Sequence, residues 1–314
     1  LVLACAVGFS FHSVATYSIG LFITPLHAEF GWGRAEITAG RTIAAILAIP
    51  LSPLLGALVD RWGSRRLAIP GLVITACSIS AFSLANGSTA QWLGLWTAYA
   101  ILSLGIKVTM WTAAVSSVFS SARGLALALT LSGTAVTQIL SPPITHYLIE
   151  AFGWRIAWVW LGFGWAIPAL VLCLFFLFDA HDERRKASKN GAENAFVELS
   201  GLSIREAIHS PPLLRVATAT LVMMILTIGI IVHQVPILTE AGVSRGNAAY
   251  LASLSGVAGI IGKLVTGFLT DKFHAGWIGG LSVGVTALGL VLLLEPIRSP
   301  GFIVLSMIII GYSF

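Results

Sequence analysis

Long apolar runs are the feature that most constrains this chain. Crossing a bilayer as a helix takes about 20 consecutive apolar residues, and nine stretches of the 314-residue sequence reach roughly that length. They are residues 2–26, 36–59, 67–85, 91–118, 124–149, 155–178, 213–237, 247–270 and 277–295. A tenth run begins near residue 301. We therefore expect an all-α polytopic membrane protein.

Composition excludes the main soluble classes. Only 10% of the residues are charged and 57% are hydrophobic, whereas a soluble domain carries roughly a quarter charged residues. The net charge of +5 does not indicate nucleic-acid binding, because the basic residues lie in short connections between apolar runs. The three cysteines are scattered inside apolar runs without metal-ligand spacing. We expect no metal site and no cofactor.

The spacing of the runs indicates two helix bundles. Six runs precede the only long polar stretch, Asp179 to Pro212, and the others follow it. The expected organisation is a six-helix bundle over 1–178, a cytoplasmic linker over 179–212 and a second bundle over 213–314. Both ends of the sequence lie inside apolar runs. We therefore expect a fragment with about ten of twelve helices, whose second bundle is truncated.

Charge asymmetry predicts the orientation. With the N-terminus inside, eleven of the 18 Lys and Arg residues fall in cytoplasmic loops and four in outer loops. This bias agrees with the positive-inside rule. We expect a multi-pass protein of the inner (plasma) membrane with a cytoplasmic N-terminus.

A short motif occurs twice, 211 residues apart, after the second and the eighth apolar run. Both copies read G-x-L-x-D, then a basic and then an aromatic residue, beginning at Gly56 and at Gly267. An acid at the inner end of a helix can pair with basic groups or with a helix N-terminus of the other bundle. Such a contact can form when the cytoplasmic side closes and break when it opens. The expected gating residues are Gly56, Asp60, Arg61, Gly63, Arg65, Arg66, Gly267, Asp271 and Lys272.

This repeat resembles the signature of the major facilitator superfamily. The resemblance implies twelve helices in two bundles that rock around a central site near the bilayer midplane. A narrower resemblance is to bacterial monocarboxylate transporters and oxalate/formate antiporters. It rests on FGWGRAEI (30–37), SARGLALA (121–128), FGWR (152–155), HQVP (233–236) and GKLVTG (262–267).

The resemblance implies a secondary active transporter of a small organic anion, a monocarboxylate, by proton symport or anion exchange. Protons and the lipid bilayer are then its other partners, and we expect a monomer. That group usually has an acid early in helix one and another just before the helix-eight cation. In this chain those positions fall near Gly8 and at Gly259, and neither carries an acid. Anion exchange is therefore an alternative to proton symport.

Three cations lie inside the apolar runs: Arg41, Lys107 and Lys263. No Asp or Glu falls deep inside any run. A cation at the bilayer centre costs on the order of 3 kcal/mol, so such residues face the protein interior or a water-filled cavity. A bound anion is the compensating charge that this pattern predicts.

Lys263 is the principal candidate for substrate binding. Gly259 and Gly267 lie one turn to either side of it, which predicts a narrow, backbone-lined wall carrying one ammonium group. The resemblance implies contact with the substrate carboxylate at a position that is usually arginine. Lysine keeps the charge but lacks the planar two-pronged grip. A structural lysine bonded to helix-end carbonyls is the alternative.

Five further residues are candidates for the site. Lys107, mid-way along the fourth helix, could bind substrate or could bond nearby Ser and Thr residues. Arg41 lies near the outer surface, where snorkelling to the interface is favoured over a cavity role. His12, with Tyr17 further along its helix, could carry a proton or could be a satisfied core histidine. Gln138 is a candidate polar cavity group.

Five tryptophans are expected mostly at the membrane interfaces and on lipid-facing surfaces. They are Trp92, Trp96, Trp154, Trp158 and Trp160.

Three rival functions are considered. A drug/proton antiporter of the same superfamily would carry a glycine-proline signature in helix five, where this chain has Gly133 and then Ser141-Pro142-Pro143. A membrane-embedded enzyme would need clustered catalytic residues at membrane depth, and none is found. A non-transporting sensor of the same fold stays open, and an uptake assay would separate it from a transporter.

Overall fold

The computed structural model describes residues 1–119, 122–178, 206, 209–240, 242–243, 245–293 and 299–313. Every regular element in these ranges is helical. Six helical stretches among them are long and apolar enough to cross a membrane: Val2–Phe30, Arg34–Trp62, Ser64–Leu84, Thr89–Val118, Arg123–Phe176 and Leu254–Lys272. The expectation of an all-α chain with many membrane-length helices is confirmed at this level.

The chain forms two compact units. One comprises Leu1–Lys186 with Lys263–His274, and the other comprises Ala187–Gly262 with Ala275–Phe314. The predicted boundaries at 1–178 and 213–314 stay a prediction. Most of the predicted linker 179–212 lies outside the described residues.

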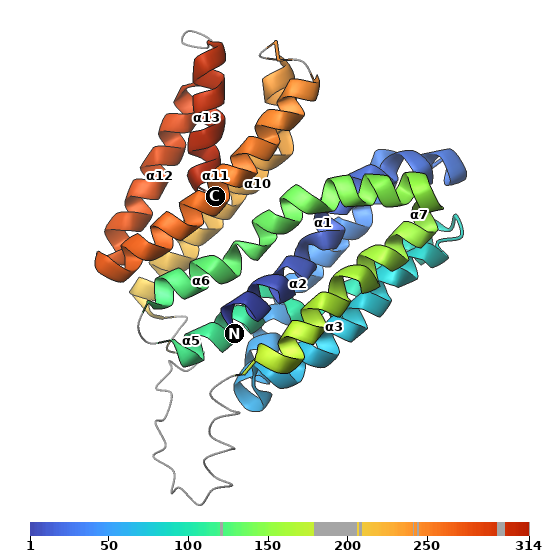
Figure 1. Cartoon of the computed structure of the whole chain (residues 1–314), viewed down its shortest axis with the longest axis horizontal. Coiled ribbons are helices and arrows are strands. Elements are labelled where there is room, and N and C mark those ends of the chain that lie inside the picture. The colour runs from blue at the N-terminus through green and yellow to red at the C-terminus, as the bar shows by residue number, and fades with distance from the viewer. Residues whose placement is uncertain are drawn as a thin grey trace, which may run out of the picture. The chain divides into compact units, whose positions relative to one another are not determined.

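The first unit is built around α1 (Val2–Phe30). Its other helices are α2 (Arg34–Trp62), α3 (Ser64–Ser80), α4 (Thr89–Leu102), α5 (Val108–Val118), α6 (Arg123–Leu131) and α7 (Gly133–Phe176). Two 3₁₀ turns, η1 (Ala81–Leu84) and η2 (Ser103–Ile106), extend α3 and separate α4 from α5. Figure 1 shows α7 running beside α1 and α3, against which it packs.

Glycines with positive φ end the long helices of this unit. Gly31 (φ 72°) closes α1, and Gly63 (φ 83°) separates α2 from α3. Gly153 (φ 79°) divides α7 into two helical halves, which agrees with the predicted runs 124–149 and 155–178. Residues with a Cβ rarely adopt this conformation, so the two Phe-Gly-Trp segments, at 30–32 and 152–154, both mark turns.

Small and hydroxyl-bearing residues bring the helices of the first unit together. Gly133 packs directly on the backbone of α1 at Ala6. The hydroxyl of Ser18 lies 2.7 Å from that of Ser141 and 2.9 Å from that of Thr145, joining α1 to the first half of α7. Close approach and interhelical hydrogen bonds of this kind stabilise helix pairs where lipid provides no hydrophobic drive.

An aromatic cluster fills the core, and it overturns the expectation for the tryptophans. Trp92, Trp96 and Trp158 are fully buried and Trp154 is nearly so, whereas Trp160 is exposed. Phe82 lies within 4.7–5.3 Å of the Trp92, Trp96 and Trp158 rings, measured between centroids. These four side chains therefore pack inside the unit rather than against lipid.

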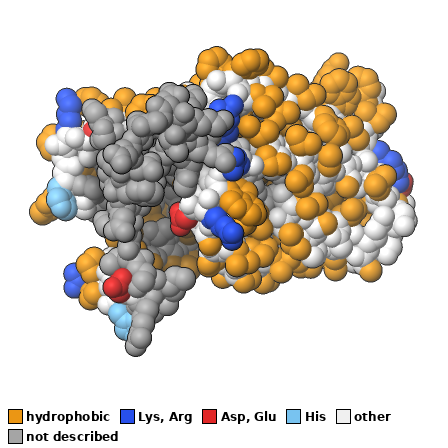
Figure 2. Space-filling model, turned by 90° about the horizontal axis from the view of Figure 1, so that it is seen from below, with side chains coloured by type: hydrophobic (Ala, Val, Ile, Leu, Met, Phe, Trp, Pro, Cys, Tyr) orange, Lys and Arg blue, Asp and Glu red, His pale blue; other side chains and the backbone are white. Residues whose placement is uncertain are grey.

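The described surface is apolar. On the face that Figure 2 shows, hydrophobic side chains cover much of the described surface, and Lys and Arg lie in a few small groups. Large side chains such as Ile49, Phe175 and Trp277 are more than 70% exposed. A soluble protein rarely exposes so much contiguous apolar surface, so these faces are suited to lipid.

The second unit contains α10 (Pro211–Glu240), α12 (Ala275–Val291), α13 (Pro300–Ser313) and most of α11 (Arg245–Lys272). Gly262 of α11 packs on the backbone of Tyr312, and Gly311 of α13 packs on that of Ser255. The Ser306 hydroxyl donates a 2.6 Å hydrogen bond to the Gly289 carbonyl, joining α13 to α12.

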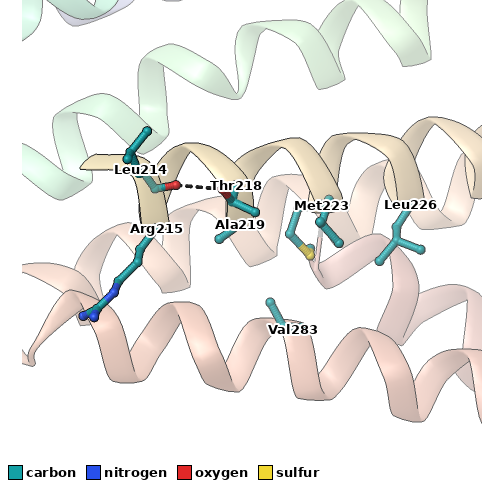
Figure 3. Close-up of a pocket in the computed structure, with 8 residues that line it drawn as sticks. Leu214, Arg215, Thr218, Ala219, Met223, Leu226 and Val283 are labelled. Carbon is teal, nitrogen blue, oxygen red and sulfur yellow. Dashed lines mark hydrogen bonds between the residues drawn. The ribbon is translucent and has the colours of Figure 1, made fainter. Parts of the chain in front are cut away.

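A pocket of about 570 Å³ lies between α10 and α12. Figure 3 shows α10 side chains along it and Val283 of α12 opposite. Its lining is almost wholly apolar: Leu214, Arg215, Thr218, Ala219, Val222, Met223, Leu226 and Val283. The Thr218 hydroxyl already donates to the Leu214 carbonyl at 2.8 Å. None of the predicted site residues lines this pocket.

Candidate functional site

Lys107 lies at a break in its span, not in a continuous helix as predicted. Its backbone is extended (φ −66°, ψ 160°), and it stands between η2 and the first residue of α5. Gly105 of η2 packs directly on Gly71 of α3, an approach that a side chain would prevent. The Trp111 indole donates to the Ile106 carbonyl at 2.9 Å. These two contacts therefore stabilise the break between η2 and α5.

His12 lies on α1 beside this break. The Trp111 ring of α5 packs on Gly8, one turn before His12. The His12 ring stacks on Phe9 with centroids 5.9 Å apart. Its Nδ1 atom is buried and has no hydrogen-bond partner among the described residues. The contact between Gly8 and Trp111 places His12 on the part of α1 that meets the start of α5, and Lys107 directly precedes that start.

Arg41 and Tyr17 lie on α2 and α1, two helices of the first unit that are in contact. Arg41, on α2, is exposed, whereas Tyr17 of α1 is partly buried and Tyr99 of α4 is buried. Gly40, its neighbour, packs on the ring of Trp96. Snorkelling and a cavity role for Arg41 both stay predictions.

Gln138 is partly buried on the first half of α7. The neighbouring Thr137 hydroxyl donates to the Ser10 carbonyl of α1 at 2.7 Å. This contact places Gln138 next to the α1–α7 interface, and its role as a cavity group stays a prediction.

Lys263 is partly buried on α11, in the part of that helix that belongs to the first unit. The ion pairs described are Arg155 with Glu29 and His146 with Glu150, so neither Lys263 nor Lys107 is paired in the described ranges. Gly267, one of the two glycines of the predicted wall, packs on Gly124 and Ala128 of α6, and the wall itself stays a prediction.

The second copy of the repeated motif makes a defined contact. The Asp271 carboxylate accepts hydrogen bonds from the backbone N–H of Gly124 at 2.7 Å and of Leu125 at 3.0 Å. These amides belong to the first turn of α6, which has no side-chain cap of its own. Of the two pairings expected for this acid, the structure has the one with a helix N-terminus. The adjacent Lys272 ammonium lies 4.3 Å from the centre of the Phe268 ring.

The first copy is arranged differently. Asp60, Arg61 and Arg66 are exposed, and no hydrogen bond of Asp60 is found in the described part of the chain. The Arg65 guanidinium donates to the Leu174 carbonyl of α7 at 2.9 Å. Gly63 supplies the turn into α3, and Gly56 has open space where a side chain would lie.

Sequence reasoning missed a cluster at the C-terminal end of α1. The Glu29 carboxylate accepts hydrogen bonds from Trp154 Nε1 and Arg155 Nη1, both at 2.6 Å. Arg155 also donates to the Ala85 carbonyl at 3.1 Å and lies 4.2 Å from the centre of the Trp154 ring. The paired Phe-Gly-Trp segments were the available signal. The cluster ties together α1, η1 and the second half of α7.

Known proteins resemble this chain over most of its length. The family model of the Major Facilitator Superfamily matches residues 5–314. Monocarboxylate transporter 13 of Bos taurus is 26% identical over 306 residues, which are 95% of this chain and 67% of that protein. The MFS transporter asaE of Aspergillus flavus is 25% identical over 71% of this chain and 48% of its own length. Monocarboxylate transporter 11 of Mus musculus is 28% identical over 46% of this chain and 32% of its own length.

Proposed function

Because the chain belongs to the Major Facilitator Superfamily, a family of membrane transporters and not of enzymes, we propose that it carries a small organic anion by alternating access. The observation that carries the proposal is the pair of lysines, Lys107 and Lys263, within helical spans and without an acidic partner among the described residues. Removing an ammonium group from water is unfavourable unless a charge or a cavity compensates it. A negatively charged substrate supplies that compensation.

Monocarboxylates are the substrate class that we propose. The names of two of the relatives describe monocarboxylate transporters, at 26% and 28% identity. The chain spans at most about two thirds of these relatives, so its substrate and its coupling ion belong to the proposal. Proton symport through His12 and anion exchange are both compatible with the arrangement around Lys107.

The repeated motif is proposed to act in gating. The Asp271 carboxylate holds the first turn of α6 through two charge-assisted hydrogen bonds, which are stronger than neutral ones. A contact between a carboxylate and a helix N-terminus can be exchanged for water at small net cost. The contact between Asp271 and α6 can therefore form when the cytoplasmic side is closed and break when that side opens. The orientation that this requires is a cytoplasmic N-terminus in the plasma membrane.

Counterflow in proteoliposomes of the full-length protein tests the proposal. Lactate, pyruvate, formate and oxalate are offered to the wild type, to Lys263→Ala and to Arg34→Gln. Arg34 is the exposed first residue of α2 and controls for the loss of one surface cation.

We expect saturable uptake of at least one carboxylate by the wild type and by Arg34→Gln, and its collapse in Lys263→Ala. Equal uptake by the wild type and Lys263→Ala removes Lys263 from the site. No carboxylate uptake by the wild type contradicts the substrate class and favours a non-transporting sensor.

A further inference from the structure

The break before α5 exposes the start of a helix at membrane depth. Thr89–Val118 is one membrane-length stretch, and α5 begins well inside it, at Val108. The Lys107 carbonyl accepts the hydrogen bond from the Met110 N–H at 3.0 Å. Among the described residues no acceptor is found for the N–H groups of Val108 and Thr109, and α5 has no side-chain cap. Unsatisfied donors within a membrane are unfavourable, so a ligand for them is expected.

His12 provides an independent indication of a ligand. Its Nδ1 atom is shielded from solvent, and no hydrogen-bond partner for it lies in the described ranges. Buried polar atoms nearly always have a partner. Trp111, on the first turns of α5, packs on Gly8, one turn before His12, so the orphaned nitrogen lies on the part of α1 that meets the start of α5.

The charges at this place all favour an anion. The N-terminus of a helix carries a partial positive charge and presents N–H groups. The Lys107 ammonium adds a full charge, and no acid pairs with it in the described part of the chain. Broken helices of this kind hold anionic substrate groups in other transporters.

We propose that the first unit contains a carboxylate seat formed by Lys107, the first-turn amides of α5 and His12. One carboxylate oxygen accepts from the ammonium group and the amides, and the other accepts from Nδ1–H of His12. The proposal rests on the proposed function and extends it, because it assigns a carboxylate contact to residues that are separate in sequence from Lys263.

Equilibrium binding of radiolabelled lactate and oxalate to the purified full-length protein tests the seat. The variants are Lys107→Met, which removes the charge, and Lys107→Arg, which keeps it. His12→Phe removes the hydrogen-bonding nitrogen, whereas His12→Asn retains a side-chain N–H. Arg34→Gln is the control for an exposed cation.

We expect Lys107→Met to raise the Kd of the bound anion roughly tenfold or more and His12→Phe to raise it roughly threefold or more. Lys107→Arg and His12→Asn should raise the Kd less than Lys107→Met and His12→Phe do, because they keep the charge and the N–H group, and Arg34→Gln should stay within about twofold of the wild type. If Lys107→Met does not fold, as judged by gel filtration, the two His12 variants and Lys107→Arg carry the test.

Three results would overturn the seat, and they differ in what else they overturn. Wild-type affinity in both Lys107→Met and His12→Phe, with uptake still lost in Lys263→Ala, removes the seat and leaves the proposed function intact. Absence of any lactate or oxalate binding by the wild type removes both. Unchanged affinity with a lower melting temperature in Lys107→Met assigns Lys107 a structural role and likewise overturns the seat.

Discussion

Gly124 shows how one residue can hold two distant segments together. Its amide donates to the Asp271 carboxylate, and a Cβ placed on it would lie 2.6 Å from the Gly267 carbonyl oxygen and 2.8 Å from Asp271 Oδ1. Both distances are shorter than real side chains tolerate. Glycine is therefore required here for close approach, not for an unusual backbone angle.

Gly124→Ala is expected to destabilise the protein because backbone atoms would have to move to make room. Overpacking of this kind costs about 1–3 kcal/mol. Gly94 of α4 has open space around it, so Gly94→Ala is the matched control, which should be neutral or stabilising by up to about 1 kcal/mol. Thermal unfolding of the two purified variants in detergent measures the difference. A Gly124→Ala variant as stable as Gly94→Ala would contradict the close approach.

Lys107 and Asp271 show how much of the candidate site the sequence could predict. Lys107 was selected as a cation inside an apolar run and is partly buried. The break that it occupies was missed, because hydropathy summed over a span does not detect one extended residue between two helices. Asp271 was expected to meet a helix N-terminus or basic groups. The partner, 147 residues earlier, is set by tertiary packing that no local pattern specifies.

At the scale of elements, the start of α5 depends on a side-chain hydrogen bond in addition to the backbone hydrogen bonds of the helix. Trp111, on the first turns of α5, donates from Nε1 to the carbonyl of Ile106 in η2. Its ring also packs on Gly8 of α1. One side chain therefore satisfies a carbonyl freed by the break and fixes α5 against α1.

Trp111→Phe should lower the free energy of unfolding more than a loss of ring area explains. The substitution leaves a buried carbonyl without its partner, which costs about 1–3 kcal/mol beyond the lost contact area. Trp158 is an equally buried tryptophan whose Nε1 has no hydrogen-bond partner among the described residues. Trp158→Phe therefore loses area alone. Chemical denaturation of both variants compares them, and equal losses would argue against a role for the indole hydrogen bond.

The apolar runs predicted the elements better than they predicted which faces are buried. The expected turn between residues 149 and 155 is confirmed at Gly153. Hydropathy does not indicate, however, which face of a helix is buried. The sequence therefore predicted a peripheral position for three tryptophans that form the core, Trp92, Trp96 and Trp158. They are buried because they pack against the rings of Phe82 and Phe22. These contacts join different helices, so the pattern along one helix does not predict them.

At the scale of the whole molecule, the multi-pass arrangement follows from the family and from the spans, whereas the direction of the chain across the membrane is a prediction from charge. Most of the Lys and Arg in the loops fall on one side. The negative inner surface potential and the insertion machinery both favour cationic loops on the cytoplasmic side. The turn before α4 should then face outward, and the turn between α11 and α12 should face inward.

Labelling of intact cells with a membrane-impermeant maleimide tests this direction. Ala90, at the start of α4, and Phe273, just after α11, are both exposed. Each is replaced by cysteine in a Cys77→Ala background, because Cys77 is the exposed native thiol among three cysteines. Ala90→Cys should react in intact cells, and Phe273→Cys should react only after permeabilisation. The opposite pattern would place the N-terminus outside. The Asp271 contact with α6, which lies next to Phe273, would then gate the outer face instead of the cytoplasmic one.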